Sequence, residues 1–207
     1  MIKSVVGQRL DALIQRLFPF LFWRPLDPDS LTVLGTLVSL AAAWAFAQSS
    51  LVAGGILILA GGFFDLVDGV VARHQGISTR FGGFLDSTLD RLVDMALLVG
   101  ISVHYAELGE PGGVLLAGVA ATASVLVSYS KARAELDGPK IDVGMLERGE
   151  RIGLLAAGSI LGFLGPALWL IAIGSTITVA QRFAAARRAL DALDARERSD
   201  PDQENPA

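Results

Sequence analysis

The sequence predicts an all-α integral membrane protein in which six transmembrane helices follow an amphipathic helix at the membrane surface. The first observation is composition: 52% of the 207 residues are hydrophobic and the mean hydropathy is +0.53, too apolar for an ordinary soluble domain. The second is pattern, because the apolar residues gather in long runs that short polar segments separate. The sequence contains no cysteine, which excludes disulfides and thiolate metal sites.

Residues 1–24 are expected to form the amphipathic interfacial helix. Their apolar side chains recur at helical spacing opposite charged ones, and few apolar residues are consecutive. Phe20, Phe22 and Trp23 would anchor the segment at the level of the lipid headgroups. A soluble capping helix with the same pattern is the alternative. No cleavable signal peptide is evident, because no charged segment precedes an apolar run with a small-residue cleavage site.

The six-span domain is expected over residues 25–188. A polar break, Pro25–Ser30, provides Ser30 or Asp29 as the N-cap of the first span. Gly165–Pro166 is expected to turn the chain before the last span. The expected spans cover residues 31–48, 51–73, 82–104, 112–135, 150–164 and 167–188.

Charge predicts the orientation of these spans. Residues 189–207 are charged and poor in apolar side chains, which favours a helical extension that frays into a disordered tail. Six spans would place this tail and the N-terminus on the same side of the membrane. The loops on the other side, residues 48–50, 104–113 and 164–167, contain no lysine or arginine. The positive-inside rule therefore predicts a multi-pass protein of the cytoplasmic membrane with both termini in the cytoplasm.

Acidic residues stand at the ends of the second and third spans, on faces that also carry glycine. With about 100° per residue in a helix, one face holds Asp65, Asp68, Gly69 and Ala72, and the other holds Gly82, Asp86 and Asp90. A carboxylate buried in a membrane costs about 2.5–3.5 kcal/mol, so four of them meeting at one place need a compensating cation. Aspartate oxygens suit Mg²⁺ or Mn²⁺, and four carboxylates from two helices can hold two such ions. The alternative, that the acids are the solvated ends of two helices, gives no reason for the glycines.

Eight residues of this stretch follow the pattern D-x2-D-G-x2-A-R-x8-G-x3-D-x3-D, which begins at Asp65 and ends at Asp90. The pattern is similar at every fixed position to the signature of the CDP-alcohol phosphotransferases, and the chain resembles that family in length and span pattern. The resemblance implies an enzyme that transfers a phosphatidyl-type group from a CDP-lipid to an alcohol, releases CMP and forms a homodimer in the lipid bilayer. It also implies that Asp65, Asp68 and Asp86 bind metal, and that Asp90 completes the metal site and acts as general base.

Four further residues are candidates for contacts with the CDP-lipid. Arg73, at the loop end of the second span, is well placed to pair with a phosphate, although a snorkelling arginine at the membrane edge is the alternative. Gly69 would allow the nucleotide close to the backbone. By the resemblance, Thr79 and Asp29 match positions that contact CDP in similar enzymes. For Asp29, a role as N-cap is the alternative.

A second group of residues concerns the acceptor. Lys131, Arg133, Arg148 and Arg151 form a basic cluster at the level of the acids, which favours an acceptor that is itself phosphorylated. Ordinary positive-inside charge is the alternative. The surrounding segments resemble the phosphatidylinositol-phosphate and archaetidylinositol-phosphate synthases. In those enzymes the acceptor phosphate is bound by residues that match Ser128, Lys131, Arg151 and, in the sixth span, Arg182.

Inositol 1-phosphate is therefore the expected acceptor, with glycerol 3-phosphate, serine or another alcohol as the alternative. The sequence departs from the pattern of the actinobacterial members around residues 137–142. A cation or proton transporter that uses intramembrane acids is the competing class of function. It gives no reason for Arg73 beside the acids, and the outer halves of the spans offer almost no polar side chains for a path. No nucleic acid is expected among the partners.

Overall fold

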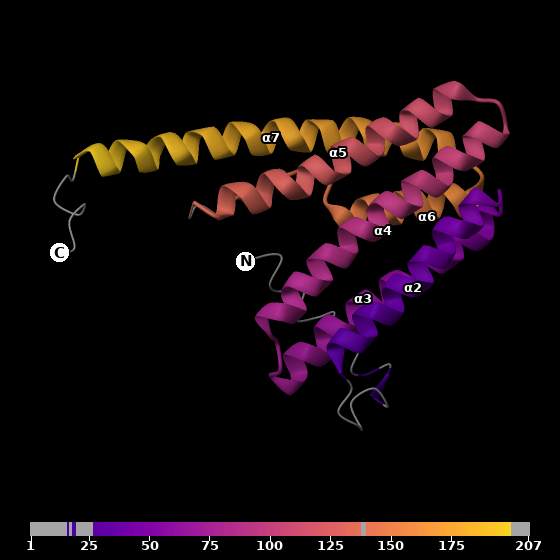
Figure 1. Cartoon of the computed structure of the whole chain (residues 1–207), viewed down its shortest axis with the longest axis horizontal. Helices are drawn as coiled ribbons and strands as arrows, with labels where there is room; N and C mark the ends of the chain where they lie inside the picture. The colour runs from indigo at the N-terminus through magenta and orange to yellow at the C-terminus, as the bar shows by residue number, and fades with distance from the viewer. Residues whose placement is uncertain (1–15, 17, 20–26, 138–139, 200–207) are drawn as a thin grey trace.

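The computed structural model describes residue 16, residues 18–19, 27–137 and 140–199, and this part of the chain is helical without a strand (Figure 1). The six expected helices are all present. They are α2 (Pro28–Ala47), α3 (Leu51–Gln75), α4 (Arg80–Glu107), α5 (Pro111–Glu135), α6 (Arg148–Leu161) and α7 (Leu164–Ser199). The predicted interfacial helix over residues 1–24 lies almost entirely outside the described residues.

Four of these helices, α2, α3, α5 and α7, are long and apolar enough to cross a membrane. The other two helices, α4 and α6, do not meet this criterion, for different reasons. α4 has 28 residues, but its first fifteen carry three aspartates and two arginines. α6 has only 14 residues, about 21 Å at 1.5 Å per residue, which is short for a hydrocarbon core of about 30 Å.

The start of α2 corrects the predicted N-cap. Asp27 is the cap, because its carboxylate accepts hydrogen bonds from both the backbone N–H and the hydroxyl of Ser30. The bond from the Ser30 side chain lowers the pKa of the Asp27 carboxyl. The prediction of Ser30 or Asp29 was wrong because Pro28 already suits the first helical position, where its missing N–H costs nothing.

The turn between α6 and α7 also differs from the prediction. Gly162, with φ of 82°, provides the left-handed cap that ends α6, and α7 begins at Leu164. Gly165–Pro166 therefore lies in the first turn of α7, where a proline needs no intrahelical partner for its nitrogen. α7 continues for 36 residues to Ser199, so residues 189–199 are helical, and residues 200–207 lie outside the described part.

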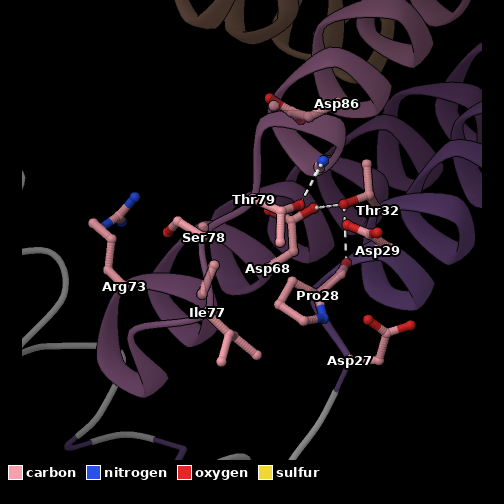
Figure 2. Close-up of a pocket in the computed structure, with 14 residues that line it drawn as sticks. Asp27, Pro28, Asp29, Thr32, Asp68, Arg73, Ile77, Ser78, Thr79 and Asp86 are labelled. Carbon is pink, nitrogen blue, oxygen red and sulfur yellow. Dashed lines mark hydrogen bonds between the residues drawn. The ribbon is translucent and has the colours of Figure 1, made fainter.

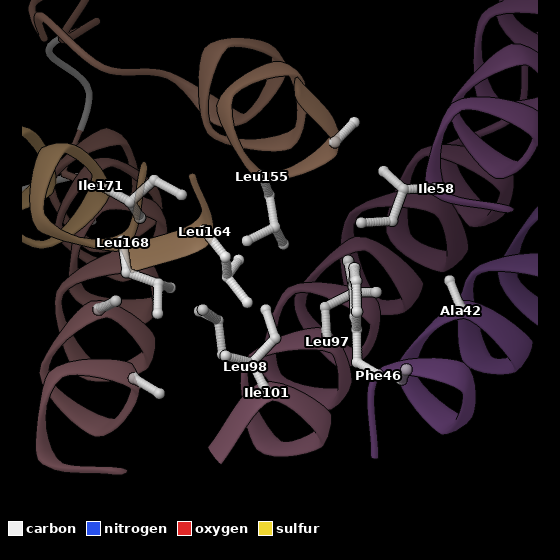
Figure 3. Packing of buried hydrophobic residues seen from close by; sticks show 14 of the residues in the cluster. Ala42, Phe46, Ile58, Leu97, Leu98, Ile101, Leu155, Leu164, Leu168 and Ile171 are labelled. Carbon is white, nitrogen blue, oxygen red and sulfur yellow. The ribbon is translucent and has the colours of Figure 1, made fainter. Parts of the chain in front are cut away.

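Small residues let the helices approach closely. A Cβ on Gly100 of α4 would overlap the carbonyl oxygen of Ala43 on α2, and a Cβ on Gly61 of α3 would overlap the Ser39 hydroxyl. The hydrophobic core draws on all six helices, and Phe46, Leu97 and Leu168 are among its buried residues (Figure 3). The core lies toward the end of the bundle that holds the turn between α2 and α3. The acidic residues lie at the opposite end.

Candidate active site

Three carboxylates from two helices meet at the acidic end of the bundle. Asp65 and Asp68 of α3 and Asp86 of α4 each offer an oxygen within 4.8 Å of the others. Asp68 is buried, and it accepts a hydrogen bond of 2.5 Å from the hydroxyl of Thr32 on α2. The donor set fits Mg²⁺ or Mn²⁺, because both ions prefer carboxylate oxygens. Thr32 was not predicted, and its only signal is a polar side chain near the N-terminal end of an apolar span.

Asp90, the fourth predicted acid, is joined to this cluster through an arginine. Arg148, the first residue of α6, places Nη2 2.8 Å from Asp90 Oδ1 and Nη1 2.8 Å from Asp65 Oδ2. Arg91 of α4 also lies 3.5 Å from Asp90. Asp90, one helical turn beyond Asp86, is therefore paired with two arginines of the protein.

One more turn along α4 stands Asp94, which sequence reasoning missed. It is buried, 2.7 Å from Arg151 and 3.5 Å from Arg148. The sequence itself indicates Asp94, because Asp86, Asp90 and Asp94 follow one another at intervals of four. Arg148 and Arg151, expected at the acceptor phosphate, thus pair with acids of α3 and α4 in this structure.

A cavity of about 400 Å³ opens beside two of these carboxylates, Asp68 and Asp86 (Figure 2). All four residues predicted to contact the CDP-lipid line it, namely Asp29, Gly69, Arg73 and Thr79, together with Asp68 and Asp86. Thr79 is also the N-cap of α4, since its hydroxyl accepts the N–H of Gly82 at 2.8 Å. A Cβ on Gly82 would lie 2.9 Å from Asp29 Oδ1. The cavity therefore shares Asp68 and Asp86 with the acid cluster.

The remaining acceptor candidates lie at the end of α5 and on α7. Lys131 pairs with Asp142 at 3.0 Å, and its side chain is one-third exposed. Arg182 is buried and donates to the backbone carbonyls of Val143 and Val127. Ser128, half-buried, stands one turn before Lys131 on α5.

Arg133 is separated from the other candidates. It pairs with Asp137 at 2.6 Å, and its side chain is 55% exposed. Residues two apart in a helix point roughly 200° apart, so Arg133 and Lys131 face opposite sides of α5. The predicted role of Arg133 at the acceptor phosphate stays a prediction, and this geometry separates it from Lys131.

Comparison with known proteins gives the family. The family model described as CDP-alcohol phosphatidyltransferase matches residues 26–186. A phosphatidylinositol phosphate synthase of Mycobacteroides abscessus is 39% identical over 187 residues, which is 86% of this chain and 84% of the relative. An archaetidylinositol phosphate synthase of Methanothermobacter thermautotrophicus is 45% identical over 162 residues, 78% of this chain and 77% of the relative.

Solved structures agree with these relatives. The crystal structure of Mycobacterium tuberculosis phosphatidylinositol phosphate synthase with CDP-DAG bound has a TM-score of 0.73 at 32% identity, covering 87% of this chain and 93% of that one. A second structure of that enzyme, in complex with manganese and citrate, has the same TM-score and covers 88% of that chain. By these matches the chain is an enzyme that belongs to the CDP-alcohol phosphatidyltransferase family.

Proposed function

We propose that this protein transfers a phosphatidyl-type group from a CDP-lipid to the hydroxyl of inositol 1-phosphate and releases CMP. The observation that carries the proposal is the shared wall between pocket and acid cluster, formed by Asp68 and Asp86. A nucleotide in the pocket would bring its pyrophosphate to the carboxylates. The CDP-DAG bound by the M. tuberculosis enzyme supports this donor.

The pocket suits a CDP group for three reasons. Its volume of about 400 Å³ falls within the roughly 300–1,000 Å³ of ligand pockets. Asp29 and Thr79 offer polar atoms for the cytidine, while Gly69 and Gly82 keep the walls clear of side chains. Arg73 brings a guanidinium to the same wall, where it would pair with a phosphate of the donor.

Asp65, Asp68, Asp86 and Asp90 would hold two divalent ions, Mg²⁺ or Mn²⁺, in this proposal. Such ions, when bound, would neutralise the pyrophosphate and stabilise the departing CMP phosphate. The manganese in the solved relative and the donor set of the three clustered carboxylates support the choice of metal.

Asp90 would accept the proton of the acceptor hydroxyl. The hydroxyl oxygen would form the new bond to phosphorus while the bond between that phosphorus and the CMP oxygen breaks. An aspartate is a weak base, so positioning and electrostatics must supply most of the rate. Its place one turn beyond Asp86 would put it beside the reacting phosphate.

The acceptor phosphate would be bound by Ser128, Lys131, Arg151 and Arg182. Arg151 and Arg182 are held in place by Asp94 and by backbone carbonyls, whereas Lys131 is more exposed and would exchange its pairs with Asp142 and Glu135 for an incoming anion. The names of the relatives support inositol phosphate over other alcohols. The transporter alternative has no support, because the matched family consists of transferases.

In the membrane, α4 and α6 would complete six spans with α2, α3, α5 and α7, and the active site and both termini would face the cytoplasm. The turns at residues 48–50, 108–110 and 162–163, at the other end of the bundle, contain no lysine or arginine, which supports this orientation. A homodimer, as the family resemblance implies, is part of the proposal.

The test is an assay of the purified protein with CDP-diacylglycerol and a panel of acceptors, following CMP release. We expect inositol 1-phosphate to be used best, and glycerol 3-phosphate, serine and free inositol to be poor acceptors. Efficient turnover of serine or free inositol instead would contradict the proposed acceptor and leave the transferase reaction intact.

A further inference from the structure

Arg148, at the start of α6, forms ion pairs with acids of both α3 and α4. Its two terminal nitrogens each lie 2.8 Å from a carboxylate, Asp65 on one side and Asp90 on the other, and Nε lies 3.5 Å from Asp94. The side chain is 23% exposed. One guanidinium thus bridges the three-acid cluster and the fourth acid.

The packing of α6 holds Arg148 in place, although a positive side chain is unfavourable at the start of a helix. A positive side chain at the first position of a helix opposes the macrodipole, and α6 starts in a capping box made by Glu147 and Glu150. Arg151, one turn later, ties the same helix to Asp94 of α4. The start of α6 is therefore fixed so that Arg148 points into the acids.

Asp65 takes part in both the three-acid cluster and the bridge that Arg148 forms. Its carboxylate is part of the cluster with Asp68 and Asp86, and one of its oxygens bonds to Arg148. A cation seated between Asp65 and Asp90 would occupy the place of the guanidinium, and two cations at that spacing repel each other strongly in a partly buried site. The arginine and such a cation cannot occupy that place together.

We propose that Arg148 is a positioning residue that acts as the resident counter-cation of the acid cluster. It neutralises Asp65 and Asp90 while no divalent ion lies between them, and a divalent ion binds there only by displacing it. This inference rests on the metal site of the proposed function, and it adds a competition between a side chain of α6 and the metal.

Mn²⁺ binding to purified full-length protein tests the competition. Arg148→Gln removes the competing charge, so it should bind Mn²⁺ tighter by tenfold or more, which is about 1.4 kcal/mol. Its Tm should also rise more on adding Mn²⁺ than that of the wild type, because its metal-free acids lack a counter-cation. The affinity is measured from the electron paramagnetic resonance signal of free Mn²⁺, and the Tm from thermal unfolding.

Arg133→Gln is the matched control, because it removes one arginine from an exposed pair with Asp137. It should leave both Mn²⁺ readouts at wild-type values. Equal Mn²⁺ affinity and equal Tm shift in Arg148→Gln and wild type would overturn the counter-cation role while leaving the metal site standing. A wild type that binds no Mn²⁺ would overturn the metal site itself, and the inference with it.

Folding of Arg148→Gln only in the presence of Mn²⁺ would support the proposal, provided that Arg133→Gln folds without metal. For the case in which Arg148→Gln folds under neither condition, Arg148→Lys is the second variant. A lysine ammonium cannot bridge the two carboxylates as the guanidinium fork does, so severalfold tighter Mn²⁺ binding is expected. Wild-type or weaker affinity in Arg148→Lys would then overturn the proposal.

Discussion

Arg151 and Asp94 form a buried ion pair between α6 and α4, with 2.7 Å between Nη2 and Oδ2 and side chains only 4% and 6% exposed. Arg151 also donates to the carbonyl of Leu146, 3.4 Å away. Such a pair contributes little net stability, but the loss of one partner leaves an uncompensated charge in the interior. The pair therefore fixes α6 against α4 beside the acid cluster.

The first prediction concerns this pair. Asp94→Leu should destabilise the protein by about 3–5 kcal/mol, because Arg151 would remain buried without its partner. The double variant Asp94→Leu with Arg151→Leu should be more stable than the single one. Thermal unfolding in detergent measures both. Asp137→Leu, which breaks an exposed pair with Arg133, is the control and should cost below about 1 kcal/mol. Equal losses in Asp94→Leu and Asp137→Leu would contradict the buried role.

The second prediction is metal dependence. Chelation with EDTA should abolish CMP release, because the carboxylates of Asp65, Asp68 and Asp86 would repel the donor pyrophosphate without ions between them. Added Mg²⁺ or Mn²⁺ should restore it. Full CMP release from chelated enzyme, with residual metal checked by elemental analysis, would rule out the metal mechanism.

The third prediction separates catalysis from donor binding. Asp90→Asn should lower kcat by about a hundredfold or more, the usual loss for a general base. CDP-lipid binding should change little, because the pocket is lined by Asp68 and Asp86 and does not include Asp90. Single-turnover CMP release and CDP-lipid titration measure the two effects. Turnover near that of the wild type would show that another group takes the proton.

The fourth prediction tests whether donor binding needs the open space beside Gly69 of α3. A Cβ on Gly69 would already lie 3.1 Å from Arg73 Nη1, so Gly69→Leu should fill the pocket and displace Arg73. CDP-lipid binding should be lost while the helices still fold. Gly62→Leu is the control on the same helix, because a Cβ there meets no atom within 4 Å. Normal CDP-lipid affinity in Gly69→Leu would show that this pocket is not the donor site.

Much of this site could be predicted because its determinants are local. The apolar runs predict the helices, and the spacing of Asp65, Asp68 and Gly69 puts them on one face of α3. The steps of four from Gly82 to Asp90 do the same for α4. Asp94 extends the same series and could have been included. The N-cap at Asp27 was also within reach, since Pro28 marks the first helical position.

The ion pairs could not be predicted, because they depend on how distant helices pack. Arg148 and Asp65 are 83 residues apart, and nothing local indicates that the start of α6 lies against α3. The same holds for Arg182, whose bonds to Val127 and Val143 depend on the packing of α7 against α5. Basic residues near a membrane surface are common, so their charge alone does not reveal their partners.

The last prediction concerns the acceptor phosphate. Lys131 forms an exposed pair with Asp142, which costs at most about 1 kcal/mol to break, so its ammonium can turn to an incoming phosphate. Losing such a charge-assisted contact costs about 1.5–3 kcal/mol. Lys131→Ala should therefore raise the KM for inositol 1-phosphate about ten- to a hundredfold, with Tm unchanged. Arg182→Ala should raise the same KM and also lower Tm, because two backbone carbonyls lose their donor.

Steady-state assays that vary one substrate at a time measure these effects. The KM for the CDP-lipid should stay near the wild-type value in Lys131→Ala, since the donor pocket does not include Lys131. Arg133→Ala is the matched control on the same helix, and it should leave both KM values unchanged because its side chain points away from Lys131. Free inositol should be a poor acceptor for the wild type, and its weak use should not depend on Lys131. If Lys131→Ala and Arg133→Ala behave alike toward inositol 1-phosphate, Lys131 does not bind the acceptor phosphate, while the metal site and donor pocket remain as proposed.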